Sequence, residues 1–329
     1  MNISVLNTGP FRINTWIVEL CKNKVLIFDP AACSVTNDSL EIVNFLKANN
    51  LEPAAFLLTH GHFDHITGTG ICKSFFPDAP LALHKEDLPM VGASAADAQK
   101  NQLEAMGLGM IVPALKGLPE PDAAFSGEPL LSSVIEAKDP DVAAALSAWK
   151  VLHTPGHTEG SVCYYNEKEK ILITGDTIFY HSWGRTDFPG GSERKMVKSL
   201  ERIYSSLPDD VLVYPGHDYA GFALTEKGRK KAKIKIERHK TISNFLEKVL
   251  LIPSDDIEKT SKQIEYSMPT DVLEKFIKFL TFMETCSCKE PKWVKSYKHF
   301  INNGELQDKC KNCINTNKSG SIECECKCC

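Results

Sequence analysis

Four short apolar runs in this chain each lead into histidine or aspartate, and no other feature constrains the fold as strongly. The run at residues 54–59 leads into HGHFDH, and the runs at 150–153, 171–175 and 211–216 each lead into one ligand-type side chain. Runs of this length, bounded by turn residues, are typical of buried strands. Because functional groups collect at the carboxyl ends of strands in open α/β folds, we expect these four ends to meet.

Seven side chains that commonly bind metal ions stand at these strand ends. They are His60, His62 and His157 for one ion, Asp64, His65 and His217 for a second, and Asp176 between the two. Gathering so many titratable groups costs desolvation and charge repulsion, and bound dications offset that cost. Imidazole and carboxylate ligands suit zinc, iron or manganese. We therefore expect two divalent metal ions, with zinc as the first choice.

The four motifs read T-H-G-H-F-D-H, T-P-G-H-T-E-G-S, T-G-D-T and P-G-H-D, in that order. Together they resemble the signature of the metallo-β-lactamase superfamily over about residues 1–222. The resemblance implies an α/β fold, an αββα sandwich, with the seven side chains as metal ligands. Because this superfamily hosts hydrolases, oxygenases, lactonases and nucleases, the fold alone leaves the reaction open.

Two further motifs narrow the resemblance. WGRTDFPGGS at residues 183–192 and PGHDYAGF at 215–222 are similar to glyoxalase II-like (hydroxyacylglutathione) hydrolases, with the persulfide dioxygenases as the nearest competitor. In glyoxalase II, the basic residue of the first motif and the tyrosine of the second help to hold glutathione. The resemblance therefore implies that Arg185 and Tyr219 bind substrate.

The glyoxalase II resemblance implies a metal-dependent thioesterase. A hydroxide shared by two ions would attack a thioester of glutathione or a similar small thiol, and the thiolate would leave without a strong general acid. Asp176 is expected to bridge the ions, and Asp64 to guide the proton of the attacking water.

The alternative is a persulfide dioxygenase, in which His60, His157 and Asp176 hold one iron. The segment HITGTG favours the oxygenases, whereas DFPGGS, the C-terminus and the long separation of His60 from His157 favour the hydrolase, our first choice. A lactonase or nuclease of the same superfamily is the weaker interpretation.

We expect a catalytic domain at residues 1–223, with an insertion or lid at 89–148, a helical extension at 224–285 and a Cys-rich tail at 286–329. Eight of the 12 cysteines lie in that tail. The tail is interpreted as an extra zinc site or as a disordered, redox-reactive segment. The terminal Cys-Cys resembles a prenylation site, but we do not expect membrane association, because such signals depend on partners that the sequence does not show.

Charge and hydropathy limit the partners. The formal net charge is −4, so no overall positive field indicates nucleic acid. The basic run at 227–240 is interpreted as a solvated helix face or as a funnel for an anionic substrate such as a glutathione or coenzyme A conjugate. The sequence contains neither a signal-peptide pattern nor an apolar segment long enough for a membrane span. We expect a cytoplasmic protein whose partner is a small-molecule thioester.

Overall fold

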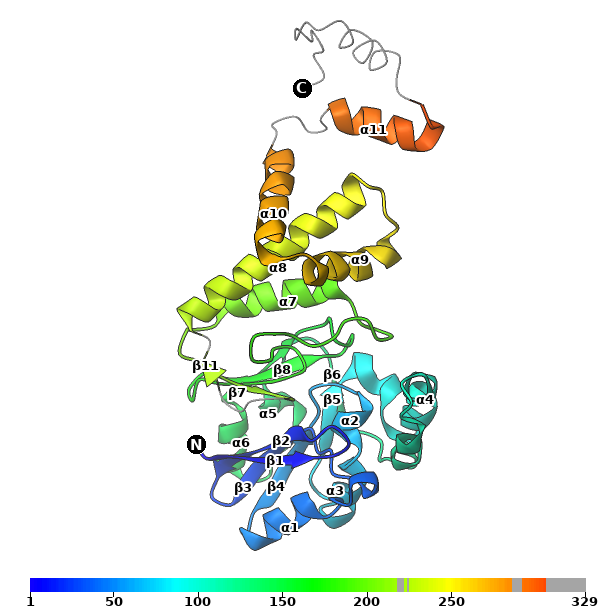
Figure 1. The fold of residues 1–329 in the computed structure, drawn as a ribbon. Coiled ribbons are helices and arrows are strands. Elements are labelled where there is room, and N and C mark those ends of the chain that lie inside the picture. Colours follow the sequence, from blue (N-terminus) through cyan, green and yellow to red (C-terminus); the bar gives the residue numbers. More distant parts are fainter. Residues whose placement is uncertain (218–221, 224, 286–291, 306–329) are drawn as a thin grey trace, which may run out of the picture. The chain divides into compact units, whose positions relative to one another are not determined.

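The computed structural model describes residues 1–217, 222–223, 225–285 and 292–305. The chain divides into two compact units, Met1–Ala232 and Lys233–Cys329. The first unit contains two β-sheets and their covering helices (Figure 1). The described part of the second unit is helical.

The first sheet has six strands in sequence order. They are β1 (Ile3–Thr8), β2 (Ile13–Cys21), β3 (Lys24–Phe28), β4 (Glu52–Leu57), β5 (Leu81–His84) and β6 (Ala123–Phe125). The first three are antiparallel, and β3 to β6 run parallel to one another. Strands β2 and β3 form a hairpin, with Trp16 opposite Phe28.

The second sheet has the strand order β11-β10-β9-β8-β7. Its strands are β7 (Trp149–His153), β8 (Val162–Asn166), β9 (Ile171–Gly175), β10 (Leu212–Pro215) and β11 (Phe222–Ala223). Among the described strands of this sheet, only β9 and β10 pair in parallel. The carboxyl ends of β9 and β10 therefore lie side by side, which brings the residues after both strands to one edge.

A dry core joins the inner faces of the two sheets. The first sheet contributes Trp16, Val18, Leu26 and Phe28, and the second contributes Val151, Val162, Tyr164, Ile171 and Ile173. The Phe28 ring lies 5.2 Å from Tyr164 and 5.7 Å from Trp149, measured between ring centroids. Each such side chain contributes roughly 2 kcal/mol by burial. Inward and outward residues alternate because successive strand side chains point to opposite faces.

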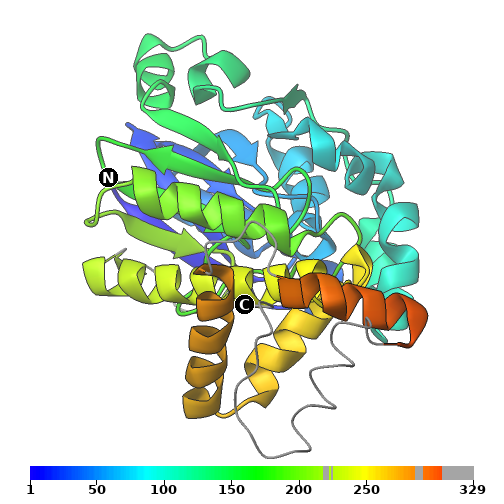
Figure 2. The ribbon, with the colours of Figure 1, turned by 90° about the horizontal axis from the view of Figure 1, so that it is seen from above.

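Helices cover both outer faces. The first sheet packs against α1 (Glu41–Ala48), α3 (Thr69–Phe75) and α4 (Ala95–Ala105) through a second apolar cluster that includes Leu46, Phe56 and Leu83. The second sheet is covered by α7 (Glu193–Ser206), whose buried side includes Met196 and Leu200 (Figures 1 and 2). These four layers confirm the expected αββα architecture, with a helical region after it.

The segment 89–148 is built into the first unit. Besides α4 and β6 it contains α5 (Leu131–Val134) and α6 (Pro140–Leu146), and the Asp139 side chain caps α6 by accepting a hydrogen bond from Asp141 N. Leu103, Ile111 and Leu115 of this segment lie in the core. The remaining short helices of the unit are η1 (Ser34–Thr36), α2 (Phe63–Ile66), η2 (Lys85–Met90), η3 (Gly92–Ser94) and η4 (Gly109–Leu115).

The helical segment contains α8 (Glu226–Lys248), α9 (Ser254–Ser267), α10 (Thr270–Thr285) and α11 (Lys292–Asn303). Its own core is formed by Ile242, Leu246, Leu273 and Leu280. Among the described residues, no helix combines the length and apolarity needed to cross a bilayer. All eight tail cysteines lie outside the described residues, and so do the predicted zinc site and the lipid-modification site.

Candidate metal centre

The first four predicted ligands stand directly after β4. The chain is extended at His62 (φ −67°, ψ 148°) and then enters α2, so that Asp64 and His65 lie on a single helical turn. All four side chains are buried, and His65 is fully so. A short extended segment followed by one helical turn thus brings four buried polar side chains together at the carboxyl end of β4.

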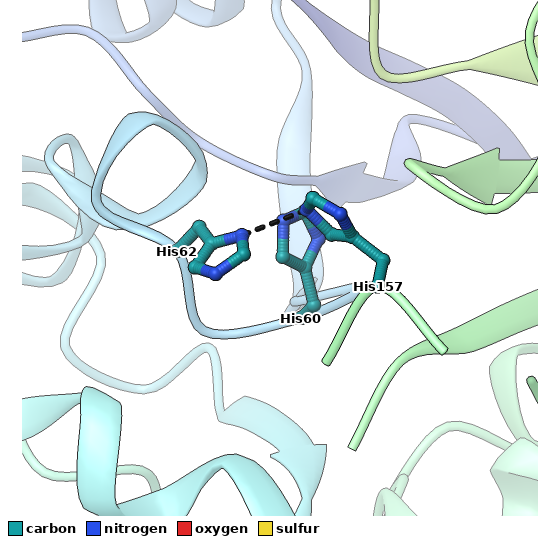
Figure 3. Close-up of side chains that lie close together, drawn as sticks. All are labelled: His60, His62 and His157. Atoms are coloured by element: carbon teal, nitrogen blue, oxygen red, sulfur yellow. Dashed lines mark hydrogen bonds between the residues drawn. The ribbon is translucent and has the colours of Figure 1, made fainter. Parts of the chain in front are cut away.

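His60, His62 and His157 form the first ligand group (Figure 3). Each offers one nitrogen, and these atoms lie within 4.8 Å of one another. His60 and His62 come from the loop after β4, whereas His157 follows β7. His62 Nδ1 lies 2.7 Å from His157 Nε2. The three imidazoles therefore converge on one point, as ligands of a single ion do.

Asp176 connects this group to a second one. Asp64, His65 and His217 form the second group, and Asp176 is grouped with His60 and His65. The Asp176 carboxylate reaches both sides: Oδ1 lies 3.3 Å from His65 Nε2, and Oδ2 lies 3.4 Å from His157 Nε2 and 3.5 Å from His217 Nε2. One carboxylate thus faces ligands of both groups.

The position of His217 is set by contacts between the two sheets. Asn14 Nδ2 and Trp16 Nε1 donate hydrogen bonds of 3.0 and 2.9 Å to Pro215 O, and Asn14 N donates to Gly216 O over 2.7 Å. Strand β2 therefore fixes the end of β10 immediately before the ligand. Elsewhere at this edge, Val162 N donates to Thr59 O over 2.9 Å.

Unpartnered polar atoms test whether metal ions fit. Nε2 of His60 is buried without a hydrogen-bond partner, and Nε2 of His65 and Oδ1 of Asp176 are buried with no well-aligned partner besides each other at 3.3 Å. Orphaned polar atoms of this kind are costly in a dry interior and call for a partner. All three face the space between the ligand groups, and their imidazole and carboxylate chemistry suits divalent metals. The cluster therefore fits a dinuclear metal site.

Asp29 orients two of the histidines through one carboxylate. His65 Nδ1 donates to Asp29 Oδ2 over 2.9 Å, and Thr59 donates to Asp29 through both its backbone N and its hydroxyl, each over 2.7 Å. His60 Nδ1 lies 3.0 Å from the Thr59 hydroxyl oxygen. Because the Thr59 proton goes to Asp29, His60 Nδ1 is the donor in this contact. With Nδ1 as the donor in both rings, Nε2 is the atom that His60 and His65 would offer to a metal ion.

The backbone performs the same task for His157. His157 Nδ1 donates to Arg185 O over 2.7 Å, which leaves Nε2 as the ligand atom.

A second carboxylate, Asp87, joins the two ligand loops. It accepts hydrogen bonds from Gly61 N (2.9 Å), Gly160 N (2.7 Å) and the Thr158 hydroxyl (2.7 Å). Gln99 adds to this brace from α4: it accepts from Phe63 N over 2.8 Å and donates to Gly61 O over 3.0 Å. The loop with His60 and His62 is thereby tied to the turn that carries His157.

Burial and charge set the protonation of the ligands. Burial, together with neighbouring imidazoles, lowers the pKa of His60 well below its ordinary value and lowers the pKa of His62 to about 3. Burial also disfavours charged Asp176, but His217, His65 and His157 outweigh it and hold the Asp176 pKa well below its ordinary range. At neutral pH, His60 and His62 present lone pairs and Asp176 is an anion, which are the forms that bind metal.

The structure brings the seven predicted ligands together. Of the two predicted substrate residues, it describes only Arg185. The Arg185 side chain is exposed and pairs with Asp187, while its backbone oxygen holds His157. Tyr219 lies outside the described residues. Sequence reasoning missed Asp29, although KVLIFD ends in a carboxylate just as the other strands end in ligands. It also missed Asp87 and Gln99, for which the sequence gives no signal.

Comparisons with known proteins identify the family. The family model described as the metallo-beta-lactamase superfamily matches residues 8–217. The chain is 32% identical over 219 residues to the probable metallo-hydrolase YqgX of Bacillus subtilis (67% of this chain, 91% of YqgX). It is 25% identical over 217 residues to hydroxyacylglutathione hydrolase GloC of Haemophilus influenzae (66% of this chain, 91% of GloC).

Two solved structures are similar as well. The BLEG-1 B3 metallo-beta-lactamase has a TM-score of 0.56 at 26% identity, with 70% of this chain and 96% of that one covered. TTHA1623 in a di-iron-bound form has a TM-score of 0.50 at 28% identity, with 67% and 94% covered.

A second family model matches the helical segment alone. The model described as the iron dependent repressor, metal binding and dimerisation domain, matches residues 225–294. The superfamily model, by contrast, covers strands β2 to β10 and contains all seven ligand positions. The chain therefore belongs to the metallo-β-lactamase superfamily.

Proposed function

We propose that this chain is a binuclear metal-dependent hydrolase of glyoxalase II type, which cleaves a thioester of a small thiol such as glutathione or coenzyme A. The observation that carries the proposal is the Asp176 carboxylate, which faces His65, His157 and His217 at 3.3 to 3.5 Å and so links two ligand groups. The similarity to GloC, which is named a hydroxyacylglutathione hydrolase, supports the thioester.

The seven ligand residues would hold the two ions, which we propose to be zinc. Iron is the next candidate, because the similar protein TTHA1623 was solved in a di-iron-bound form. When bound, the ions supply Lewis acidity and a water that is acidic enough to ionise near neutral pH.

The residues of the chain supply position and charge. Asp64 Oδ2 lies 3.4 Å from His217 Nε2, and His65 and His217 hold the Asp64 pKa below its ordinary value against the effect of burial. Asp64 is therefore an anion that can accept a hydrogen bond from the attacking water and orient it. The leaving thiolate needs no strong acid, because its conjugate thiol has a pKa of about 8.5. Arg185 and Tyr219 are proposed to face the substrate.

A thioesterase assay with metal removal tests the proposal. We expect the purified chain to hydrolyse S-acyl glutathione, to fall below about 1% of that rate after treatment with a chelator, and to recover when zinc is added. His62→Ala should behave like the metal-depleted protein, whereas His299→Ala in α11 should match the wild type. Oxygen uptake with glutathione persulfide and one iron per chain, without thioester hydrolysis, would instead support the dioxygenase and contradict the proposal.

A further inference from the structure

Two phenylalanine rings of the segment 178–190 lie against the metal ligands. The Phe188 ring packs edge-on against His62, with ring centroids 5.6 Å apart. The Phe179 ring packs in the same manner against His217, at 5.9 Å. His62 and His217 belong to different ligand groups. Apolar rings therefore border both ends of the centre.

The backbone of this segment is fixed against the centre. Arg185 O accepts the hydrogen bond from His157 Nδ1. At Gly184, a Cβ atom would lie 1.9 Å from Asp176 O, a distance that no side chain tolerates, so the segment approaches as closely as glycine allows. The ring of Phe188 is thus presented by a chain segment that the ligand residues themselves hold in place.

Arg185 supports the Phe188 ring, and its charge is already paired. Arg185 donates to Asp187 through two parallel hydrogen bonds, Nε to Oδ1 at 3.0 Å and a terminal nitrogen to Oδ2 at 2.8 Å. Its guanidinium carbon lies 4.1 Å from the centre of the Phe188 ring. These two parallel hydrogen bonds place the positive charge of Arg185 against a carboxylate of the same chain. The guanidinium of Arg185 lies over the Phe188 ring, and the two groups together form a flat surface on which part of a substrate can pack.

We infer that Phe188, backed by Arg185, is the surface on which an apolar acyl group of the substrate packs. The inference rests on the proposed function. Phe188 lies against His62, a ligand of the centre where the thioester carbonyl would react. The acyl group is bonded to that carbonyl, whereas the adenine ring of coenzyme A is separated from it by the whole pantetheine arm, so the acyl group is the part that reaches the ring. The preferred substrates are therefore thioesters of alkyl or aryl acids. Burial of each acyl methylene group on the ring corresponds to about a fourfold gain in binding.

A series of acyl groups on one neutral thiol tests this. The values of kcat/KM for S-acetyl-, S-hexanoyl- and S-benzoyl-N-acetylcysteamine are compared for the wild type, Phe188→Ala, Phe188→Leu and Phe75→Ala. Phe75 is an exposed phenylalanine of α3 that packs on Lys47, and serves as the matched control. Metal content is measured on each variant, because Phe188 contacts His62.

We expect the wild type to prefer the hexanoyl and benzoyl thioesters over acetyl by at least about tenfold. Phe188→Ala should lose most of this preference, mainly through KM, with its metal content unchanged. Phe188→Leu should keep much of the hexanoyl preference, and Phe75→Ala all of it. A wild type that favours acetyl, or an unchanged preference in Phe188→Ala, would overturn the inference while leaving the thioesterase intact. If the wild type hydrolyses none of the three, and no S-acyl glutathione, the proposed function itself fails.

The Asp187→Asn variant tests the role given to Arg185. Loss of the carboxylate frees the guanidinium for an anionic thiol, so kcat/KM for S-hexanoyl-glutathione should rise about threefold relative to the neutral S-hexanoyl thioester. An unchanged ratio would contradict the inference that the pair with Asp187 keeps the charge of Arg185 from attracting an anionic thiol.

Discussion

Asp176→Ala is expected to lower kcat/KM by on the order of 10³-fold and to remove most of the bound metal. Asp176 is buried and lies within 3.5 Å of ligand nitrogens from both groups, so its loss affects both ions. Metal ions provide several kcal/mol of transition-state stabilisation, and about 4 kcal/mol corresponds to the stated loss in rate. Activity and metal content measured on the same sample check the result.

Asp210→Ala is the matched control for this substitution. Asp210 is an exposed aspartate that pairs with Lys170 on the surface, and exposed pairs of this kind contribute little to stability. Its replacement should leave both metal content and turnover near the wild-type values. Full turnover and unchanged metal content in Asp176→Ala would contradict the assignment of the shared ligand.

Asp29→Ala is expected to weaken metal binding by roughly 10- to 100-fold, although Asp29 is not itself among the predicted ligands. Its carboxylate holds His65 directly and His60 through Thr59, so both rings lose their orientation. Three buried donors lose their acceptor, and each costs about 1–3 kcal/mol, so the free energy of unfolding should fall by roughly 3 kcal/mol or more.

The Asp29→Asn variant distinguishes the effect of losing the carboxylate from the effect of straining the backbone at this position. Asp29 has a φ of 52°, in the left-handed region that asparagine tolerates better than alanine. Asparagine also keeps one acceptor oxygen, but it loses the second acceptor and the negative charge. Its metal affinity, measured by competition with a chelator, should therefore fall between those of the wild type and Asp29→Ala. Wild-type affinity in both variants would show that Asp29 does not position the histidines.

The strands and the ligand set could be predicted from sequence because both depend on local patterns. Apolar runs with turn residues at their ends predict β4, β7, β9 and β10, and the residue that follows each run carries the chemistry. The same rule, applied to the run KVLIF, would have found Asp29 after β3. A residue that orients a metal ligand can thus stand at the same place in the sequence, directly after an apolar strand, as the ligand itself.

The remaining contacts depend on tertiary structure. Asp87 meets Gly160 and Thr158, more than 70 positions away along the chain, and no periodicity encodes such a meeting. Gln99 lies in the segment 89–148, where alanine, proline and glycine obscure any pattern and 3₁₀ turns stand beside short α-helices. A tail rich in cysteine and lysine similarly hid α11, although the sequence WVKSYKHFI repeats large apolar residues at helical spacing.

Metal stoichiometry by element tests the central claim most directly. The sample is the full chain with its eight tail cysteines replaced by serine, so that thiolates cannot bind metal and confuse the count. We predict about two equivalents of divalent metal per chain, chiefly zinc, falling below one in Asp176→Ala. A single equivalent of iron, or a content that is the same in Asp176→Ala, would contradict a dinuclear centre bridged by this carboxylate.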